Sequence, residues 1–87
     1  MGRMPTGTLR YWAAARAAAG CAEEGFDAAT LGAALRLAAA RRDERFAAVL
    51  ARSSFLVDGV PVGTRDRDSV SLAQGSVVEV LPPFAGG

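Results

Sequence analysis

The chain has 87 residues, which is the length of one small domain, and it buries too little surface to enclose a large substrate cleft of its own. It contains no His, no Lys and a single Cys, which excludes a protein-built zinc site, a Cys–His catalytic pair and Schiff-base chemistry. Ten basic and nine acidic residues are scattered along the same segments and give a net charge of +1, a pattern that argues against nucleic-acid binding.

The single cysteine, Cys21, allows no intramolecular disulfide and suits a reducing compartment. We interpret it as a small buried or half-buried hydrophobe rather than as a reactive thiol. No apolar stretch reaches the roughly 18 residues that span a bilayer, so we expect a cytoplasmic protein without a membrane partner. Residues 1–7 contain Gly and Pro without periodicity and are expected to form a disordered lead-in.

Residues 8–13 alternate in a way that is typical of a half-buried strand. Leu9 and Tyr11 fall on one side of this strand, whereas Arg10 and Trp12 fall on the other. The sequence therefore predicts that Leu9 and Tyr11 face the core.

Two helices are predicted in the first half of the chain. Residues 13–19 are rich in Ala, the best helix former, and stop at a glycine, while residues 21–27 form a plausible short strand. The main helix is expected to begin at Thr30, its N-cap, and to end near Arg41 or Arg42, where cations suit the helix dipole. Its apolar face at helical spacing consists of Leu31, Ala34, Leu35 and Ala38.

A hairpin is the clearest local signal in the second half. Residues 44–51 predict a short amphipathic turn or helix that covers the core, and residues 54–57 predict a strand. Asp58-Gly59 then favours a tight hairpin turn, after which residues 60–62 return as an edge strand because they contain a proline.

The last strand is predicted at residues 76–81, with Val78 and Val80 on its buried side. Residues 65–68 alternate Arg and Asp and are interpreted as an exposed charged loop. The order of elements predicts an α+β fold over residues 8–82, a β-grasp roll whose mixed sheet of about five strands packs on one main helix.

The chain ends Pro82-Pro83-Phe84-Ala85-Gly86-Gly87, directly after this strand. We expect residues 83–87 to form a flexible tail, because two terminal glycines without Cβ atoms are thin enough to enter a narrow site on another protein. The carboxylate of Gly87 is therefore the expected reactive group.

Three stretches match a known pattern. Residues 9–16 are an aromatic-Ala strand end that runs into a helix with a central Arg, residues 55–59 contain a Val-Asp-Gly hairpin, and residues 77–87 read strand, Pro-Pro, apolar, any residue, Gly-Gly. On these stretches residues 8–87 resemble the ubiquitin-like sulfur carriers, most closely the MoaD-like family of molybdopterin synthase small subunits. The turn at residues 74–76 departs from the Asp-Gly-Asp of that family.

The resemblance implies a carrier cycle that depends on partners. A ubiquitin-activating-like adenylyltransferase would use ATP to adenylate the carboxylate of Gly87, and a sulfur donor protein would convert it to a thiocarboxylate. The large subunit of molybdopterin synthase would then pass the sulfur to a cyclic pterin precursor. Phe84, Ala85 and Gly86 would occupy the partner's channel, with Phe84 as the apolar anchor. The chain would bind no cofactor or metal itself, and we expect no activity from it alone.

Several alternatives remain open at this stage. The same tail and fold suit a sulfur carrier for cysteine or thiamin biosynthesis, a ubiquitin-like protein modifier, or an interaction domain with an inert tail. Phe84 either anchors in a partner or folds back onto the edge of the core. Trp12, on the side of the sheet opposite the helix, either docks the partner or packs against the helix that follows it.

The arginines of the helical region are interpreted as solvated residues rather than as a docking patch, because a helix end and neighbouring acids already account for them. They are Arg36, Arg41, Arg42, Arg45 and Arg52.

Overall fold

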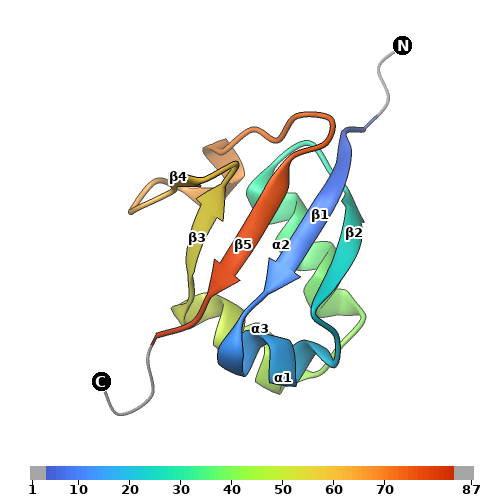
Figure 1. The fold of residues 1–87 in the computed structure, drawn as a ribbon, viewed down its shortest axis with the longest axis vertical. Coiled ribbons are helices and arrows are strands. Elements are labelled where there is room, and N and C mark those ends of the chain that lie inside the picture. Colours follow the sequence, from blue (N-terminus) through green and yellow to red (C-terminus); the bar gives the residue numbers. More distant parts are fainter. Residues whose placement is uncertain (1–3, 84–87) are drawn as a thin grey trace.

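The structure, a computed structural model, describes residues 4–83; residues 1–3 and 84–87 lie outside the described part. Five strands, three α-helices and one 3₁₀ turn follow one another within it (Figure 1). In chain order they are β1 (Thr6–Tyr11), α1 (Ala13–Ala19), β2 (Glu23–Asp27), α2 (Leu31–Ala40), α3 (Glu44–Arg52), β3 (Ser54–Val57), β4 (Val60–Pro61), η1 (Arg67–Ser69) and β5 (Val77–Leu81).

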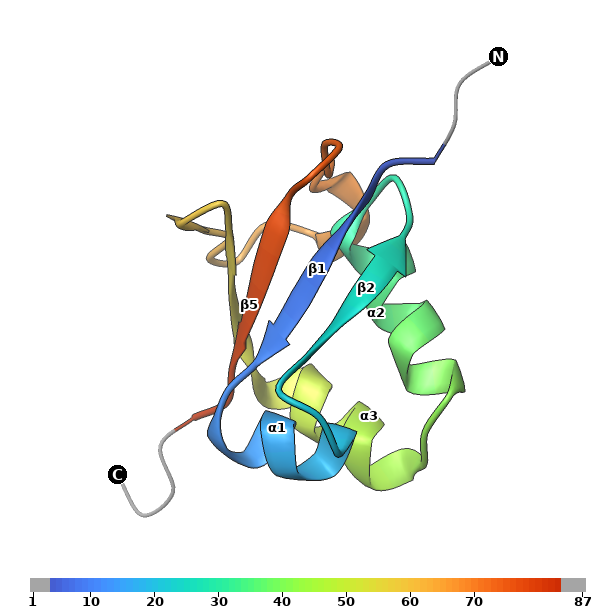
Figure 2. The same cartoon turned by 45° about the vertical axis from the view of Figure 1, so that its right-hand side comes forward.

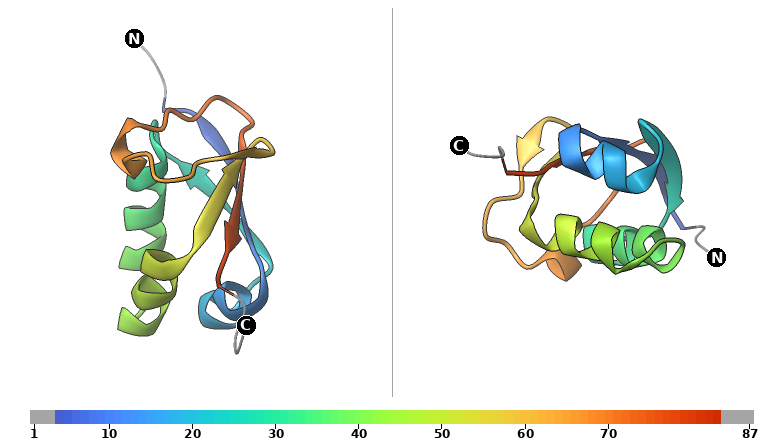
Figure 3. Two further views of the ribbon diagram at one scale, coloured as in Figure 1. Left: turned by 90° about the vertical axis from the view of Figure 1, so that its left-hand side faces the viewer. Right: turned by 90° about the horizontal axis from the view of Figure 1, so that it is seen from below.

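The five strands form one mixed sheet in the order β2-β1-β5-β3-β4, so the last strand of the chain lies at its centre. β1 runs parallel to β5, and the other neighbours are antiparallel. α2 covers one face of the sheet, and α1 and α3 lie together at the end where β5 finishes (Figures 2 and 3). The predicted α+β roll, a mixed sheet packed on one main helix, is therefore confirmed.

The core forms where the sequence pattern placed it. All four residues predicted for the apolar face of α2 are buried, and Thr30 caps this helix by accepting a hydrogen bond from the Ala33 N–H at 3.2 Å. Leu9, Tyr11, Val78 and Val80 all face the helices, with no more than 2% of any of them exposed. The strand alternation thus correctly distinguished the two faces of the sheet.

The Asp58-Gly59 hairpin is also confirmed. Both residues have positive φ angles, 51° and 81°, which is the geometry that a two-residue hairpin turn requires. The Asp58 carboxylate accepts hydrogen bonds from the Val77 N–H at 2.8 Å and from the Ser76 hydroxyl at 3.0 Å. The turn is therefore tied to the start of the central strand as well as to its own hairpin.

β1 begins at Thr6, two residues before the predicted start, so residues 6 and 7 belong to the sheet rather than to the lead-in. The Thr6 N–H donates to Oε1 of Gln74 at 3.1 Å. Gly7 is required by a close approach, because a Cβ atom there would lie 2.2 Å from the carbonyl oxygen of Ser76. These contacts join residues far apart in the chain, which is why local composition suggested a loop.

The prediction of a merely exposed charged loop at residues 65–68 is wrong in part, because its second half enters the 3₁₀ turn η1 and Arg67 packs inward. The Arg67 guanidinium donates to the carbonyl oxygens of Leu50 at 3.1 Å and Ser53 at 3.4 Å. It also lies 4.4 Å from the centroid of the Phe55 ring. Arg67 thus closes the end of α3, whose last carbonyls have no partner within the helix.

A polar cluster that joins β1, β2 and the segment after α2, hereafter the Glu24 clasp, corrects the interpretation of Arg42 as a solvated residue. Arg42 has 14% of its side chain exposed and pairs with Glu24 at 2.7 Å. Its guanidinium lies 4.7 Å from the centroid of the Phe46 ring, and the Tyr11 hydroxyl also donates to Glu24. The more exposed Arg41 reaches the same carboxylate at 3.3 Å.

Burial alone would raise the pKa of Glu24, but hydrogen bonds from Arg42 and Tyr11 hold that pKa below its usual range. Burial, and then the hydrogen bond to Glu24, raises the pKa of the Tyr11 hydroxyl. Cys21 is half-buried against the core, with its Sγ 3.7 Å from Nη2 of Arg42, as expected for a small hydrophobe. The cluster therefore keeps Glu24 ionised and Tyr11 protonated at neutral pH.

Among residues 4–83 no helix is long and apolar enough to cross a membrane. Within the same residues no three His, Cys, Asp or Glu side chains gather in a way that could hold a metal ion.

Candidate functional site at the base of the tail

The central strand determines where the C-terminal tail leaves the domain. β5 pairs with β3 up to the contact between Leu81 and Ser54, and Pro82 and Pro83 follow immediately. Proline has no N–H to donate to a neighbouring strand, so the ladder cannot continue past this point. The predicted tail residues Phe84, Ala85, Gly86 and Gly87 lie outside the described residues, and their predicted roles remain predictions.

A largely apolar hollow of about 490 Å³ lies at this end of the sheet. We call it the tail-base hollow. Three segments that are far apart in the sequence form its wall: the start of α1, the junction of α3 with β3, and the end of β5. The lining residues are 12–14, Arg52, Ser54 and 81–83.

Trp12 is the aromatic residue of this wall, and 45% of it is exposed. Its indole Nε1 donates to Oε1 of Glu79 at 3.2 Å, and its backbone N–H donates to the carbonyl of Val80 at 3.2 Å. Both bonds attach Trp12 to β5, the strand that carries the tail. The sequence left Trp12 either as a docking residue or as one that packs against the following helix, and only the parallel pairing of β1 and β5 places it beside Pro82 and Pro83.

Ala13, the next residue of the wall, has a φ angle of 47°, in the left-handed region that favours glycine. For an L-residue with a Cβ atom this conformation costs on the order of 1–2 kcal/mol. It turns the chain from β1 into α1 within one residue and so places Trp12 and Ala14 on the same wall. This strain could not be predicted from local composition, because alanine is the ordinary residue of a helix.

Arg52 supplies the charge at the rim of the tail-base hollow. Its side chain is exposed, and it forms no ion pair with any of residues 4–83. Arg45 lies on the same flank of α3 and is also exposed and unpaired within the described residues. The interpretation of both as solvated agrees with their exposure.

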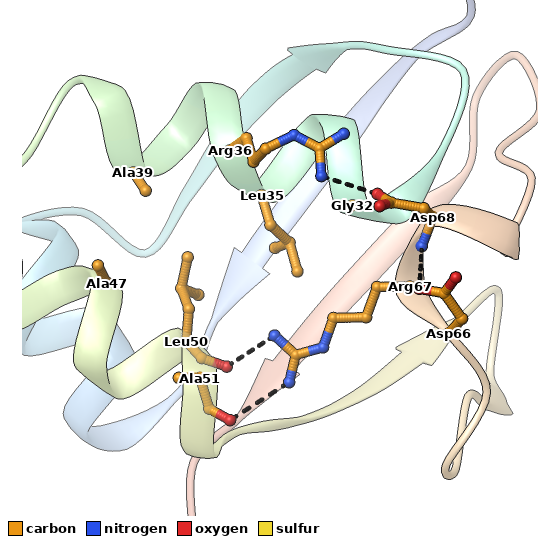
Figure 4. A pocket seen from close by; sticks show the side chains of 10 residues that line it. All are labelled: Gly32, Leu35, Arg36, Ala39, Ala47, Leu50, Ala51, Asp66, Arg67 and Asp68. Atoms are coloured by element: carbon orange, nitrogen blue, oxygen red, sulfur yellow. Dashed lines mark hydrogen bonds and ion pairs between the residues drawn. The ribbon is translucent and has the colours of Figure 1, made fainter.

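A second hollow of about 360 Å³, the α2–α3 hollow, borders the opposite flank of α3 (Figure 4). Its floor is apolar, and its rim carries Arg36, Arg67, Asp66 and Asp68. Arg36 pairs with Asp68 at 2.8 Å, Asp66 accepts from the Asp68 N–H at 3.1 Å, and Arg67 is bonded to the carbonyls at the end of α3. Every charged group of this rim has an internal partner.

With this geometry established, comparison with known proteins identifies the family. The model of the ThiS family matches residues 9–87, which is nearly the whole chain. The chain belongs to the ThiS family. This family comprises the ThiS/MoaD-like, ubiquitin-like sulfur carriers, in agreement with the resemblance of the three sequence stretches. No curated protein sequence matches the chain.

Solved structures share the fold of this ThiS-family chain. The small archaeal modifier protein 1 from Methanosarcina acetivorans aligns with a TM-score of 0.82 at 17% identity, over 99% of this chain and 100% of its own. The Haloferax volcanii HVO 2177 protein aligns with a TM-score of 0.79 at 28% identity, over 100% and 91%. A putative molybdopterin converting factor, subunit 1, from Pyrococcus furiosus aligns with a TM-score of 0.76 at 24% identity, over 92% and 99%.

Proposed function

We propose that this ThiS-family chain is the sulfur-carrier subunit of a molybdopterin synthase. Gly87 is adenylated at its carboxylate, becomes a thiocarboxylate and donates its sulfur to a cyclic pterin precursor in molybdenum cofactor biosynthesis. The observation that carries the proposal is the end of the central strand. β5 stops at Pro82-Pro83 beside an apolar hollow, and the family match continues from there to residue 87.

The chemistry assigns ATP and the catalytic groups to partners. A carboxylate oxygen is a poor leaving group, so a ubiquitin-activating-like adenylyltransferase first joins the Gly87 carboxylate to AMP and releases pyrophosphate. The outer sulfur of a persulfide on the donor protein then attacks the acyl carbon, and AMP departs. A thiol cleaves the resulting acyl disulfide, so the donor leaves as a disulfide with that thiol and Gly87 keeps the sulfur as a thiocarboxylate. Docking on the large synthase subunit makes the delivery of sulfur effectively intramolecular.

The tail residues after the prolines and Trp12 at the base of the tail then have distinct roles. Phe84 anchors the tail in the channel of the large subunit, while Ala85 and Gly86 fit its narrow part because they have small or no side chains. Trp12 docks the partner's surface beside the channel, since exposed aromatic residues with a polar handle are the usual centre of such interfaces.

Mass spectrometry tests the reacting atom. After incubation with the adenylyltransferase, ATP and a sulfur donor, the C-terminal peptide should gain the mass of one sulfur in exchange for one oxygen, at Gly87. Omission of ATP is the control and should leave the peptide unchanged. A peptide that remains unmodified in the complete mixture contradicts the proposal.

Tagged and substituted variants test the need for this terminus. A tag after Gly87 should abolish sulfur transfer and leave the thermal midpoint unchanged, whereas the same tag before Met1 should preserve both. Gly86→Val should reduce transfer nearly as strongly, through a clash in the channel. If the C-terminally tagged, unprocessed protein supports cofactor synthesis in cells that lack the native copy, the Gly87 carboxylate is not the reactive group.

A ubiquitin-like protein modifier is the second candidate. The observation that favours it is the fold shared with a small archaeal modifier protein over nearly the whole chain. A modifier would become joined to target lysines through isopeptide bonds, so the C-terminal peptide recovered from cells distinguishes the two functions. Sulfur carriers for cysteine or thiamin biosynthesis are distinguished by the nutrient that a strain without this chain requires.

A further inference from the structure

The two flanks of α3 differ in whether their charged side chains have partners within the described residues. Ala47, Leu50 and Ala51 face the α2–α3 hollow, where each charged side chain of the rim has an ion-pair or hydrogen-bond partner within the domain. Arg45 and Arg52 are seven residues apart and therefore share the other flank, separated by about 10 Å along the helix axis. That flank borders the tail-base hollow through Arg52.

Ala48 and the half-buried Val49 lie between these two cations on their flank. Ala48 is exposed and leaves the helix surface flat there, so another chain can approach it closely. The nearby acids are engaged or turned away: Asp43 caps α3 by accepting from the Phe46 N–H at 3.2 Å, and Glu44 lies about 100° around the helix from Arg45. The flank therefore presents net positive charge beside an apolar hollow.

We propose that the Arg45–Arg52 flank and the tail-base hollow together dock an acidic segment of the adenylating partner, with one apolar side chain of that segment seated against Trp12. This inference rests on the proposed function and specifies the chemistry of the partner's surface. Guanidinium groups bind carboxylates through two parallel hydrogen bonds, so the two arginines fix the direction of the segment as well as attracting it.

The location suits two arginines that have no ion-pair partner among residues 4–83. A segment held by Arg52 lies next to Pro82 and Pro83, where the chain leaves the sheet, so docking there orients the following residues toward the partner's nucleotide. Complementary charge mainly accelerates and steers association, and its effect is screened by salt. The proposal therefore predicts a salt-dependent encounter with the partner.

The test uses ATP–pyrophosphate exchange by the ubiquitin-activating-like adenylyltransferase of the organism that makes this chain, with the full chain as substrate. Arg45→Glu/Arg52→Glu should raise the carrier concentration for half-maximal exchange by about tenfold or more at low salt, with little change in the maximal rate. The wild-type value should rise with salt, and the dependence should flatten in the double variant.

The matched control is Arg36→Glu, which changes the same kind of charge on the other side of α3, at the α2–α3 hollow. It should leave exchange unchanged, and thermal midpoints of all variants verify folding. If wild-type chain supports exchange but the Arg45/Arg52 variant behaves like the Arg36 variant, the docking flank is wrong and the proposed function stands. If wild-type chain supports no exchange at all, the proposed function itself fails and the inference falls with it.

Discussion

The two hollows beside α3 both have apolar floors and arginine at the rim. They differ in whether those arginines have partners within the described residues. In the α2–α3 hollow Arg36 and Arg67 are bonded to a carboxylate and to helix-end carbonyls. At the tail-base hollow Arg52 has no partner within residues 4–83, and Trp12 is half exposed. An arginine near a pocket therefore indicates a docking site only when the domain itself has not used its hydrogen bonds.

If this contrast holds, substitution of an arginine that is bonded within the domain should lower the free energy of unfolding. Substitution of a residue at the tail-base hollow should instead weaken binding to the partner protein.

The Glu24 clasp should show the largest effect on stability. Arg42→Ala leaves Glu24 mostly buried without its closest cation, which should lower the free energy of unfolding by about 3 kcal/mol. Arg41→Ala is the control, because its side chain is 60% exposed and its loss should cost under about 1 kcal/mol. Urea unfolding of both variants measures the difference, and equal losses would contradict the clasp.

The same clasp should make stability depend on pH in the acid range. The pKa of Glu24 is lower in the folded chain than its ordinary 4.5, so its contribution is complete above that value and is lost as pH falls through the lower folded pKa. Glu24→Gln should therefore be less stable at neutral pH and should lose less stability on acidification than wild type. Thermal midpoints at a series of pH values test this, and parallel curves for the two proteins would refute it.

Arg67→Ala should come next in size, because it removes the donor to several carbonyls at the end of α3 and the contact with the Phe55 ring. We expect a loss of about 2 kcal/mol, since a charged donor to partly buried acceptors contributes more than a neutral one. Arg36→Ala removes an exposed pair from the same hollow and should cost about 0.5 kcal/mol. Chemical unfolding should rank the two in this order; the reverse order would make η1 a merely solvated loop.

Trp12→Ala should change stability by less than about 1 kcal/mol, because much of the side chain is already exposed and its hydrogen bond to Glu79 lies at the surface. Binding to the adenylating or synthase partner should weaken by about 2 kcal/mol. Calorimetric titration and thermal melts measure the two quantities, with Trp12→Phe as an intermediate variant that keeps an aromatic ring. A large drop in melting temperature with unchanged affinity would assign Trp12 to packing instead of docking.

Ala13→Gly should have the smallest effect, and its sign is informative. Glycine relieves the left-handed strain at φ 47° but gives the unfolded chain more freedom, so the net change should be zero or a gain of under about 1 kcal/mol. Ala14→Gly, one residue further into α1, has no strain to relieve and should lose about 0.5–1 kcal/mol. A comparable loss at both positions would show that Ala13 is not strained.

Much of the fold could be predicted from local patterns. Alternation at Leu9 and Tyr11 and helical spacing from Leu31 to Ala38 select a buried face by geometry alone, and Asp58-Gly59 specifies a turn through the φ angles it tolerates. The ending Pro82-Pro83 to Gly86-Gly87 indicated the family, and proline at the end of a central strand removes the N–H groups that would continue its ladder. These features depend on neighbours within a few residues, and sequence alone is enough for them.

The site depended on contacts that no local pattern encodes. Parallel pairing of β1 with β5 brings Trp12 to the base of the tail across 70 residues of sequence, and the packing of α3 distinguishes a bonded Arg67 from an unpaired Arg52. A charged side chain finds hydrogen-bond partners in whatever segments surround it, and segments distant in the sequence come close to it only after the chain has folded. Sequence therefore determined which residues form the sheet and its tail, and tertiary structure decided which of the arginines remain available to a partner.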